Sequence, residues 1–152
     1  MKPVVRNRLT PFEIMPGNLS LIDGSKALHD MLSRQPEYTS GWGFRDEDGN
    51  IVAREFMMRK GGDERLYKIR NVYAYLFAVE VFEPYRGREY AGEMISWLAR
   101  KIHDEEGVNE LYLAVMKDNT SALKAYGKLG FEVVGSRFFA RVLKLNIPYH
   151  TL

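Results

Sequence analysis

Two segments of the chain contain side chains suited to binding or proton transfer, and the first is a basic turn. Arg86, Gly87 and Arg88 lie between a long apolar stretch and an amphipathic helical pattern. A helix N-terminus offers unpaired N–H groups and a partial positive charge, and arginine binds phosphate with paired hydrogen bonds. Because open α/β sheets bind ligands where a strand leads into a helix, the turn predicts a pyrophosphate site. The alternative is an exposed basic turn without a ligand.

The second segment contains Tyr126, which follows another apolar stretch. Its spacing from Ala122 and Leu129 places all three on one helical face. A phenol can protonate a thiolate or alkoxide leaving group, which favours a role as general acid. A tyrosine in this position can equally be a core residue whose hydroxyl reaches solvent. Asn119, at the start of the same helix, is open to both a binding role and a helix-capping role.

The elements that must position these residues follow from the pattern of apolar residues and turns. Asp46–Asn50 has the composition of a hairpin turn between two strands, and an apolar strand from about Tyr73 to Phe82 follows later. The pattern then predicts, in order, a helix from Ala91 ending at Gly107, a strand over Leu111–Met116, a helix ending at Gly130, and a closing hairpin over Phe131–Leu145. The expected fold class is α/β (α+β), with a mixed central β-sheet flanked by helices.

Length and composition narrow the class of protein further. A chain of 152 residues is expected to form one domain, residues 1–152. A net charge of +2 gives no broad basic surface, so no nucleic-acid partner is expected. The absence of cysteine excludes a disulfide scaffold, a cysteine nucleophile and thiolate metal sites, and the histidines show no metal-ligand spacing. The N-terminus lacks a signal-peptide core and no apolar run could cross a bilayer, so we expect a cytoplasmic protein without membrane contact.

The two segments together resemble the GNAT superfamily of N-acetyltransferases. Arg86-x-x-Glu89-x-Ala91 is similar to its acyl-CoA-binding signature, usually Gln/Arg-x-x-Gly-x-Gly/Ala. Asn119-x-x-Ala122-x-x-x-Tyr126-x-x-x-Gly130-Phe131 matches its second signature at every usual position. One departure is Glu89, which stands where the motif prefers glycine. A carboxylate there is unfavourable beside a pyrophosphate unless it points away, and its side chain limits close backbone approach.

The resemblance implies a set of roles, with acetyl-CoA as co-substrate and no metal. The amides of the phosphate turn and the following helix start would bind the coenzyme A pyrophosphate; these residues are Arg86, Gly87, Arg88, Glu89, Tyr90, Ala91 and Gly92. Val81 and Phe82 would present backbone groups to the pantetheine and the thioester carbonyl. Asn119 and Ala122 would lie along the pantetheine arm, and Tyr126 would protonate the departing thiolate.

The residue that accepts the proton of the attacking amine is less clearly indicated. Glu80 is the one charged residue in the apolar strand and is the candidate catalytic base. An unpaired buried carboxylate is costly, so the alternative is a structural ion pair with an arginine such as Arg54 or Arg70. Aromatic residues that could wall an amine pocket, or belong to the core, are Trp42, Phe44, Tyr73, Tyr75, Phe138 and Phe139.

The resemblance therefore predicts transfer of an acetyl group from acetyl-CoA to a primary amine by direct attack. The expected acceptor is a small molecule such as an amino sugar, polyamine or amino acid, and a homodimer is compatible with the sequence. Acetylation of a protein N-terminus or lysine is the first alternative. Ala114 stands where some relatives carry a carboxylate, which weakens the analogy with the N-terminal type. The second alternative is a non-catalytic acyl-CoA-binding module on the same fold.

Overall fold

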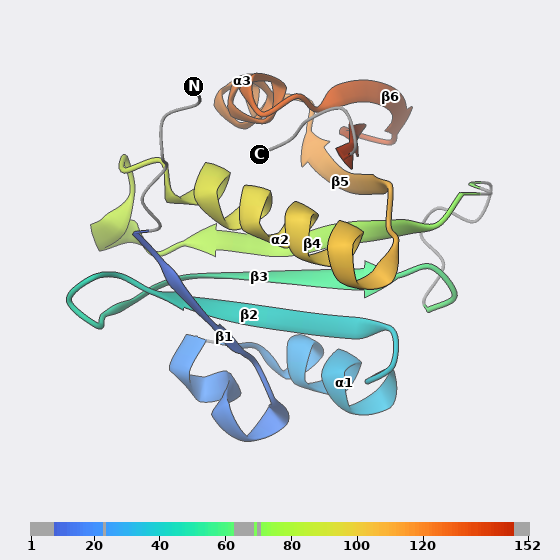
Figure 1. Cartoon of the computed structure of the whole chain (residues 1–152). Helices are drawn as coiled ribbons and strands as arrows, with labels where there is room; N and C mark the ends of the chain where they lie inside the picture. Colours follow the sequence, from blue (N-terminus) through green and yellow to red (C-terminus); the bar gives the residue numbers. More distant parts are fainter. Residues whose placement is uncertain (1–7, 23, 63–68, 70, 148–152) are drawn as a thin grey trace.

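A computed structural model describes residues 8–22, 24–62, 69 and 71–147. The described residues form one seven-stranded sheet with helices on both faces (Figure 1). In chain order the elements are β1 (Thr10–Glu13), the 3-10 helix η1 (Pro16–Ile22), α1 (Lys26–Arg34), β2 (Thr39–Arg45), β3 (Ile51–Arg59), β4 (Tyr73–Val81), the short 3-10 helix η2 (Glu83–Tyr85), α2 (Tyr90–Glu106), β5 (Glu110–Met116), α3 (Thr120–Lys128), β6 (Glu132–Arg137) and β7 (Ala140–Asn146).

The sheet is mixed, as the sequence predicts. Its strand order is β1-β2-β3-β4-β5-β7-β6, and every neighbouring pair is antiparallel except β4 and β5, which are parallel. The strand–helix–strand connection through α2 accounts for that one parallel pair, because a parallel connection needs a crossover element.

Apolar side chains form a separate core on each face of the sheet. The larger core joins the inward residues of α2, among them Met94, Ile95 and Leu98, to alternate residues of β3, β4 and β5. The smaller core joins η1 and α1 to the opposite face, through Ile22, Leu28, Leu32 and Phe56. Figure 1 shows α2 crossing β4, with α1 separated from it by β2 and β3. Because both faces are covered, the central strands are apolar on both sides.

Side-chain caps and a glycine form three of the helix ends. The Asn119 side chain caps α3 by accepting a hydrogen bond from the backbone N–H of Ala122 at 3.2 Å. Ser25 caps α1 in the same way through Leu28 at 3.3 Å. Gly107 ends α2 with a left-handed φ of 69°, a conformation that glycine adopts without strain.

The feature of the fold that creates a site is the divergence of β4 from β5. Their paired residues are Tyr73–Tyr75 of β4 and Glu110–Tyr112 of β5, and within the described chain the pairing ends there. Both strands continue beyond that point, β4 to Val81 and β5 to Met116. Two central strand edges therefore separate from one another in the middle of the sheet, and their backbone groups border a gap.

A β-bulge in β4 accompanies this divergence. The register between β3 and β4 shifts between Arg54 and Phe56, and Ala78 has a positive φ of 51°. A non-glycine residue in this left-handed region is strained by about 1–3 kcal/mol. The bulge turns the backbone of β4 within the part that no longer pairs with β5.

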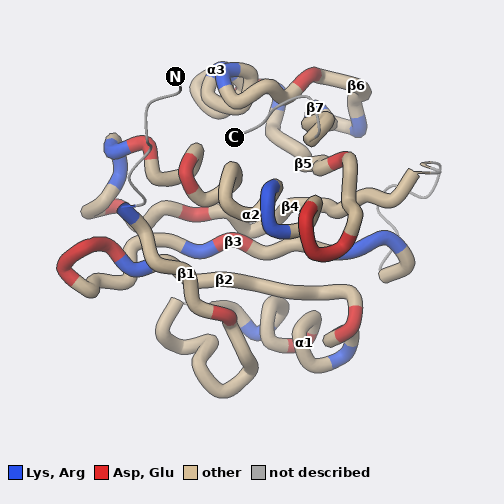
Figure 2. The backbone as a smooth tube through the Cα atoms, in the orientation of Figure 1, with Lys and Arg blue, Asp and Glu red and all other residues tan. Residues whose placement is uncertain are grey.

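Charged residues of both signs are spread along the described part of the chain. Figure 2 shows Lys and Arg in short segments that alternate with Asp and Glu along the chain. No helix among the described residues is both long and apolar enough to span a membrane. Arg70, the other arginine named as a possible partner of Glu80, lies outside the described residues.

Candidate active site

The predicted phosphate turn is a tight connection between β4 and α2. The short helix η2 follows β4, and the Arg86 N–H donates to the Glu83 carbonyl at 3.3 Å. Gly87 and Glu89 both have left-handed backbones, with φ of 81° and 62°, and α2 begins at the next residue, Tyr90. The turn therefore brings the first residues of α2, whose N–H groups have no partner within the helix, to the same cavity as the end of β4.

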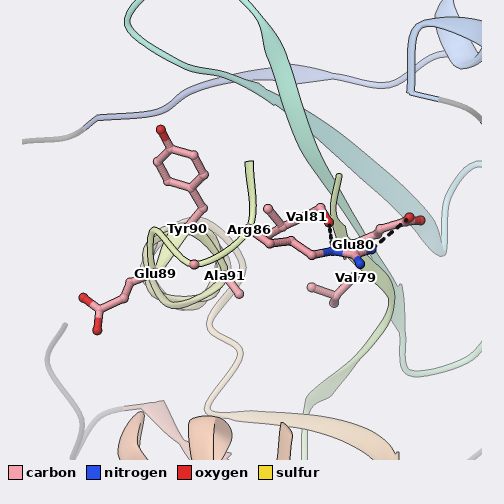
Figure 3. Close-up of a pocket in the computed structure, with 8 residues that line it drawn as sticks. Val79, Glu80, Val81, Arg86, Glu89, Tyr90 and Ala91 are labelled. Atoms are coloured by element: carbon pink, nitrogen blue, oxygen red, sulfur yellow. Dashed lines mark hydrogen bonds and ion pairs between the residues drawn. The ribbon is translucent and has the colours of Figure 1, made fainter. Parts of the chain in front are cut away.

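The left-handed backbone of Glu89 explains why the resembled motif prefers glycine at this position. Glycine adopts a positive φ without a Cβ clash, whereas glutamate stores strain there. Glu89 is exposed, and its side chain makes no capping hydrogen bond to α2. Figure 3 shows its carboxylate pointing away from Arg86 and from the end of β4.

A cavity of about 350 Å³ lies between the turn and the last residues of β4 (Figure 3). Its lining residues are Val79, Glu80, Val81, Arg86, Gly87, Glu89, Tyr90 and Ala91. The cavity thus joins the N-terminus of α2 to the part of β4 that has left β5. A long ligand that carries phosphate at one end could lie along both.

Arg86 folds back into this cavity. Its Nε donates to the Val81 carbonyl at 2.8 Å, and its Nη2 lies 3.8 Å from Glu80 Oε1 (Figure 3). The other oxygen of Glu80 accepts from Arg54 Nη2 at 3.0 Å. Arg54 also donates to the Ile22 carbonyl at 3.2 Å. The predicted structural pair between Glu80 and Arg54 is therefore confirmed, and Arg86 adds a second guanidinium to it.

Tyr126 lies on the inward face of α3. Its ring packs against the larger core and meets Phe131 edge to face, with 5.7 Å between ring centroids. The pKa of Tyr126 is raised, first by burial and second by the negative charge of Glu55. A raised pKa keeps the phenol protonated at neutral pH, the state that a general acid needs.

The structure gathers about half of the predicted site residues around the cavity. Val81, Arg86, Gly87, Glu89, Tyr90 and Ala91 line it, together with Glu80. The other six predicted residues do not line it; they are Phe82, Arg88, Gly92, Asn119, Ala122 and Tyr126.

Several of these residues have structural contacts that the sequence did not indicate. Phe82 packs against the smaller core, on the α1 side of the sheet. The Arg88 guanidinium lies 5.8 Å from the ring of Tyr85. A Cβ at Gly92 would lie 3.3 Å from Leu129, so this glycine lets α2 and α3 approach closely.

The aromatic residues considered as pocket walls do not line the cavity. Trp42, Phe44 and Tyr73 are buried in the protein core. Phe138 and Phe139 lie at the turn between β6 and β7 and are 90% and 66% exposed, so they do not enclose a ligand.

Sequence reasoning missed Glu55, Ala78 and Val79. Val79 lines the cavity, and Ala78 forms the bulge beside it. Glu55 is fully buried on β3 and contributes to the raised pKa of Tyr126. Its only signal in the sequence was a carboxylate within a strand that is otherwise mostly apolar. Among the described residues, no group of three or more His, Asp or Glu side chains could hold a metal ion.

Comparison with known proteins agrees with this geometry. The model of the acetyltransferase (GNAT) family matches residues 23–131. No curated protein sequence matches the chain.

Many solved structures share the fold. A spermidine N-acetyltransferase from Vibrio cholerae, in complex with CoA and spermine, has a TM-score of 0.73 at 12% identity, covering 95% of this chain and 99% of that one. The dodecameric structure of that enzyme in an intermediate state has a TM-score of 0.71 at 13% identity, covering 93% and 95%. Mutant forms of the spermidine/spermine N-acetyltransferase SpeG from the same organism have a TM-score of 0.73 at 14% identity, covering 95% and 97%.

Proposed function

Because the chain belongs to the acetyltransferase (GNAT) family, we propose that it transfers an acetyl group from acetyl-CoA to a primary amine of a small molecule. The observation that carries this proposal is the gap between β4 and β5, with the N-terminus of α2 at its end. The separated strand edges offer backbone hydrogen-bond groups of the kind that the amides of pantetheine require. The helix N-terminus and Arg86 offer positive charge for a pyrophosphate.

Each residue of the site then has a proposed task. The turn from Arg86 to Gly92 holds the pyrophosphate, and Asn119 and Ala122 flank the pantetheine. Val81 presents backbone groups to the pantetheine. Phe82 does not, because its N–H donates to the Val52 carbonyl at 2.8 Å and its carbonyl accepts from the Tyr85 N–H at 2.9 Å. When bound, the coenzyme supplies the activated acetyl group. The chain contains no cysteine, so no acyl-cysteine intermediate forms and the amine attacks directly.

We assign the two proton transfers to Tyr126 and Glu80. Tyr126 donates its phenolic proton to the departing sulfur, which its protonated state allows. Glu80 lines the cavity with a carboxylate that is 41% exposed, and it accepts the proton of the amine directly or through water. Its pair with Arg54 holds that carboxylate at the end of β4.

The choice of acceptor follows from charge as well as from the fold. Arg54 and Arg86 place two positive charges beside the single carboxylate of Glu80. Such a site disfavours a highly charged cation and favours an amine that also carries an anionic or neutral polar group. Spermidine and spermine, the substrates named for the similar structures, should therefore be poorer acceptors than amino acids and amino sugars, and a panel should contain all of them.

The test is release of free coenzyme A thiol from acetyl-CoA in the presence of each amine. We expect release that depends on the added amine and saturates with it. Tight acetyl-CoA binding without release by any amine or peptide would favour the non-catalytic module. Release with N-terminal or lysine peptides alone would favour the protein acetyltransferase.

Two broader expectations remain proposals. Residues 1–152 act as a single domain, which the shared sheet of the described residues supports. A homodimer, if formed, would use the exposed apolar residues of the β6–β7 hairpin, which include Val133, Val134, Phe138 and Phe139.

A further inference from the structure

Glu55 is a buried carboxyl group that the proposed mechanism does not use. Its side chain is 0% exposed, and neither of its oxygens has a hydrogen-bond partner among the described residues. The adjacent Arg54 does not neutralise it, because that guanidinium bonds Glu80 and the Ile22 carbonyl. An ionised carboxylate in such surroundings is strongly disfavoured, and burial raises the pKa of Glu55 well above its usual range.

The position of Glu55 places it beside the unusual part of β4. It pairs with Trp42 of β2 on one side. On the other side it lies at the register shift of the β4 bulge, next to Ala78 and Val79. Strand alternation puts its side chain on the same face as Ala53 and Met57, in the larger core against which Tyr126 packs.

The groups that face Glu55 from the neighbouring elements are almost all apolar. The inward residues of α2 are aliphatic apart from the rings of Tyr90 and Trp97, and Trp97 packs edge to face on Trp42. Those of β5 are Leu111, Leu113 and Val115. Arg59, further along β3, bonds Glu106 at 2.5 Å. On α3 the inward titratable group is Tyr126, whose phenol senses the charge of Glu55.

We propose that Glu55 is a positioning residue that acts through Tyr126: it stays uncharged while the phenol donates its proton, and its ionisation at higher pH suppresses that donation. When Tyr126 donates, its O–H bond breaks, an S–H bond forms, and the negative charge moves from the leaving sulfur to the phenolate oxygen. A second negative charge nearby opposes this step in a low-dielectric core. The catalytic meaning of this inference rests on the proposed function, whereas the coupling of the two groups does not.

The coupling can be measured without turnover by titrating Tyr126. Tyrosinate absorbance is recorded against pH for the parent protein and for the Tyr126→Phe variant. The difference between the two curves is the titration of Tyr126 alone. Glu55→Gln should let Tyr126 ionise at lower pH, because the carboxylate that repels the phenolate is gone. Glu106→Gln, a matched control on α2 that removes a carboxylate with no part in the raised pKa of Tyr126, should leave its titration unchanged. An unchanged titration in Glu55→Gln would overturn the proposal.

The uncharged state of Glu55 can be tested through stability. A carboxyl whose folded-state pKa is raised stabilises the fold fully below its unfolded pKa, about 4.3 for glutamate, and loses that contribution as pH rises toward the folded pKa. Within that window the unfolding equilibrium constant of the parent protein should rise about tenfold per pH unit relative to Glu55→Gln. Equal pH dependence in the two proteins would show that Glu55 is charged and would also overturn the proposal. Glu55→Met, which is apolar and similar in length, gives the same test if the glutamine variant folds poorly.

Turnover then tests the catalytic part. As pH rises through the ionisation of Glu55, kcat of the parent enzyme should decline, and Glu55→Gln should lack this decline while its kcat at neutral pH stays within about threefold. The same decline in both proteins would overturn the positioning role. Absence of turnover with every amine would instead refute the proposed function, and the titration and stability results would still decide whether Glu55 acts on Tyr126.

Discussion

Replacing Glu89 with glycine should both stabilise the fold and strengthen coenzyme binding. Glu89 has a φ of 62°, and relief of left-handed strain is worth about 1–3 kcal/mol. Glycine loses about 0.5–1 kcal/mol through the greater freedom of the unfolded chain, and removing a carboxylate from the start of α2 costs about 0.3–1 kcal/mol. From the central values of these terms, the net stabilisation is about 0.6 kcal/mol, or about 1–2 °C in Tm for a chain of this size.

The variant Glu89→Gln separates the backbone effect from the charge effect. It retains the strained backbone of the parent protein but loses the favourable interaction of a carboxylate with the N-terminus of α2. It should therefore be slightly less stable than the parent protein. Both variants should bind acetyl-CoA about threefold more tightly at low salt, because they remove a negative charge near the pyrophosphate site even though the Glu89 carboxylate points away from the cavity (Figure 3). This gain should shrink as salt is added. Thermal unfolding measures the first effect and calorimetric titration the second. If Glu89→Gln stabilises the protein as much as Glu89→Gly, the reasoning from backbone strain is wrong.

Two further substitutions test the remaining charged groups. Arg86→Ala should weaken acetyl-CoA binding by about tenfold, as measured by calorimetry. This is the low end of the binding free energy of a charge-assisted hydrogen bond, because Arg86 must first leave Val81 and Glu80. Unchanged affinity in a folded variant would mean that the phosphate turn is misassigned. Glu80→Gln should lower kcat by at least tenfold and recover activity at higher pH, where the amine needs no base; a lower Tm with normal kcat would leave Glu80 as only the partner of Arg54.

The fold was predictable from the sequence because its signals are local and agree with one another. The helix over Tyr90–Glu106 has one apolar stripe and ends at Gly107, and the Asp46–Asn50 turn joins two strands as expected. The Arg54–Glu80 pair was also predictable as one of two alternatives, since a charge in a buried strand needs a partner.

Other features of the site depend on contacts between distant segments, which the sequence does not specify. The left-handed backbones of Ala78 and Glu89 arise from the bulge and the tight turn, and neither residue type indicates such a conformation. Arg86 was expected to face a phosphate, but it folds onto Val81 because that carbonyl lies within its reach. Glu55 resembles any polar residue in a strand, and only the covering by α2 and α3 makes it a buried acid.

The most direct test of the central claim compares the parent enzyme with Tyr126→Phe in amine-dependent thiol release. The substitution retains the ring that packs against Phe131 and removes only the proton donor. Acetyl-CoA affinity should stay nearly constant, while kcat should fall about 10²–10⁴-fold. The lower end of this range is favoured because water can partly supply the proton. A folded Tyr126→Phe protein with nearly normal turnover would contradict the account and remove Tyr126 from the mechanism.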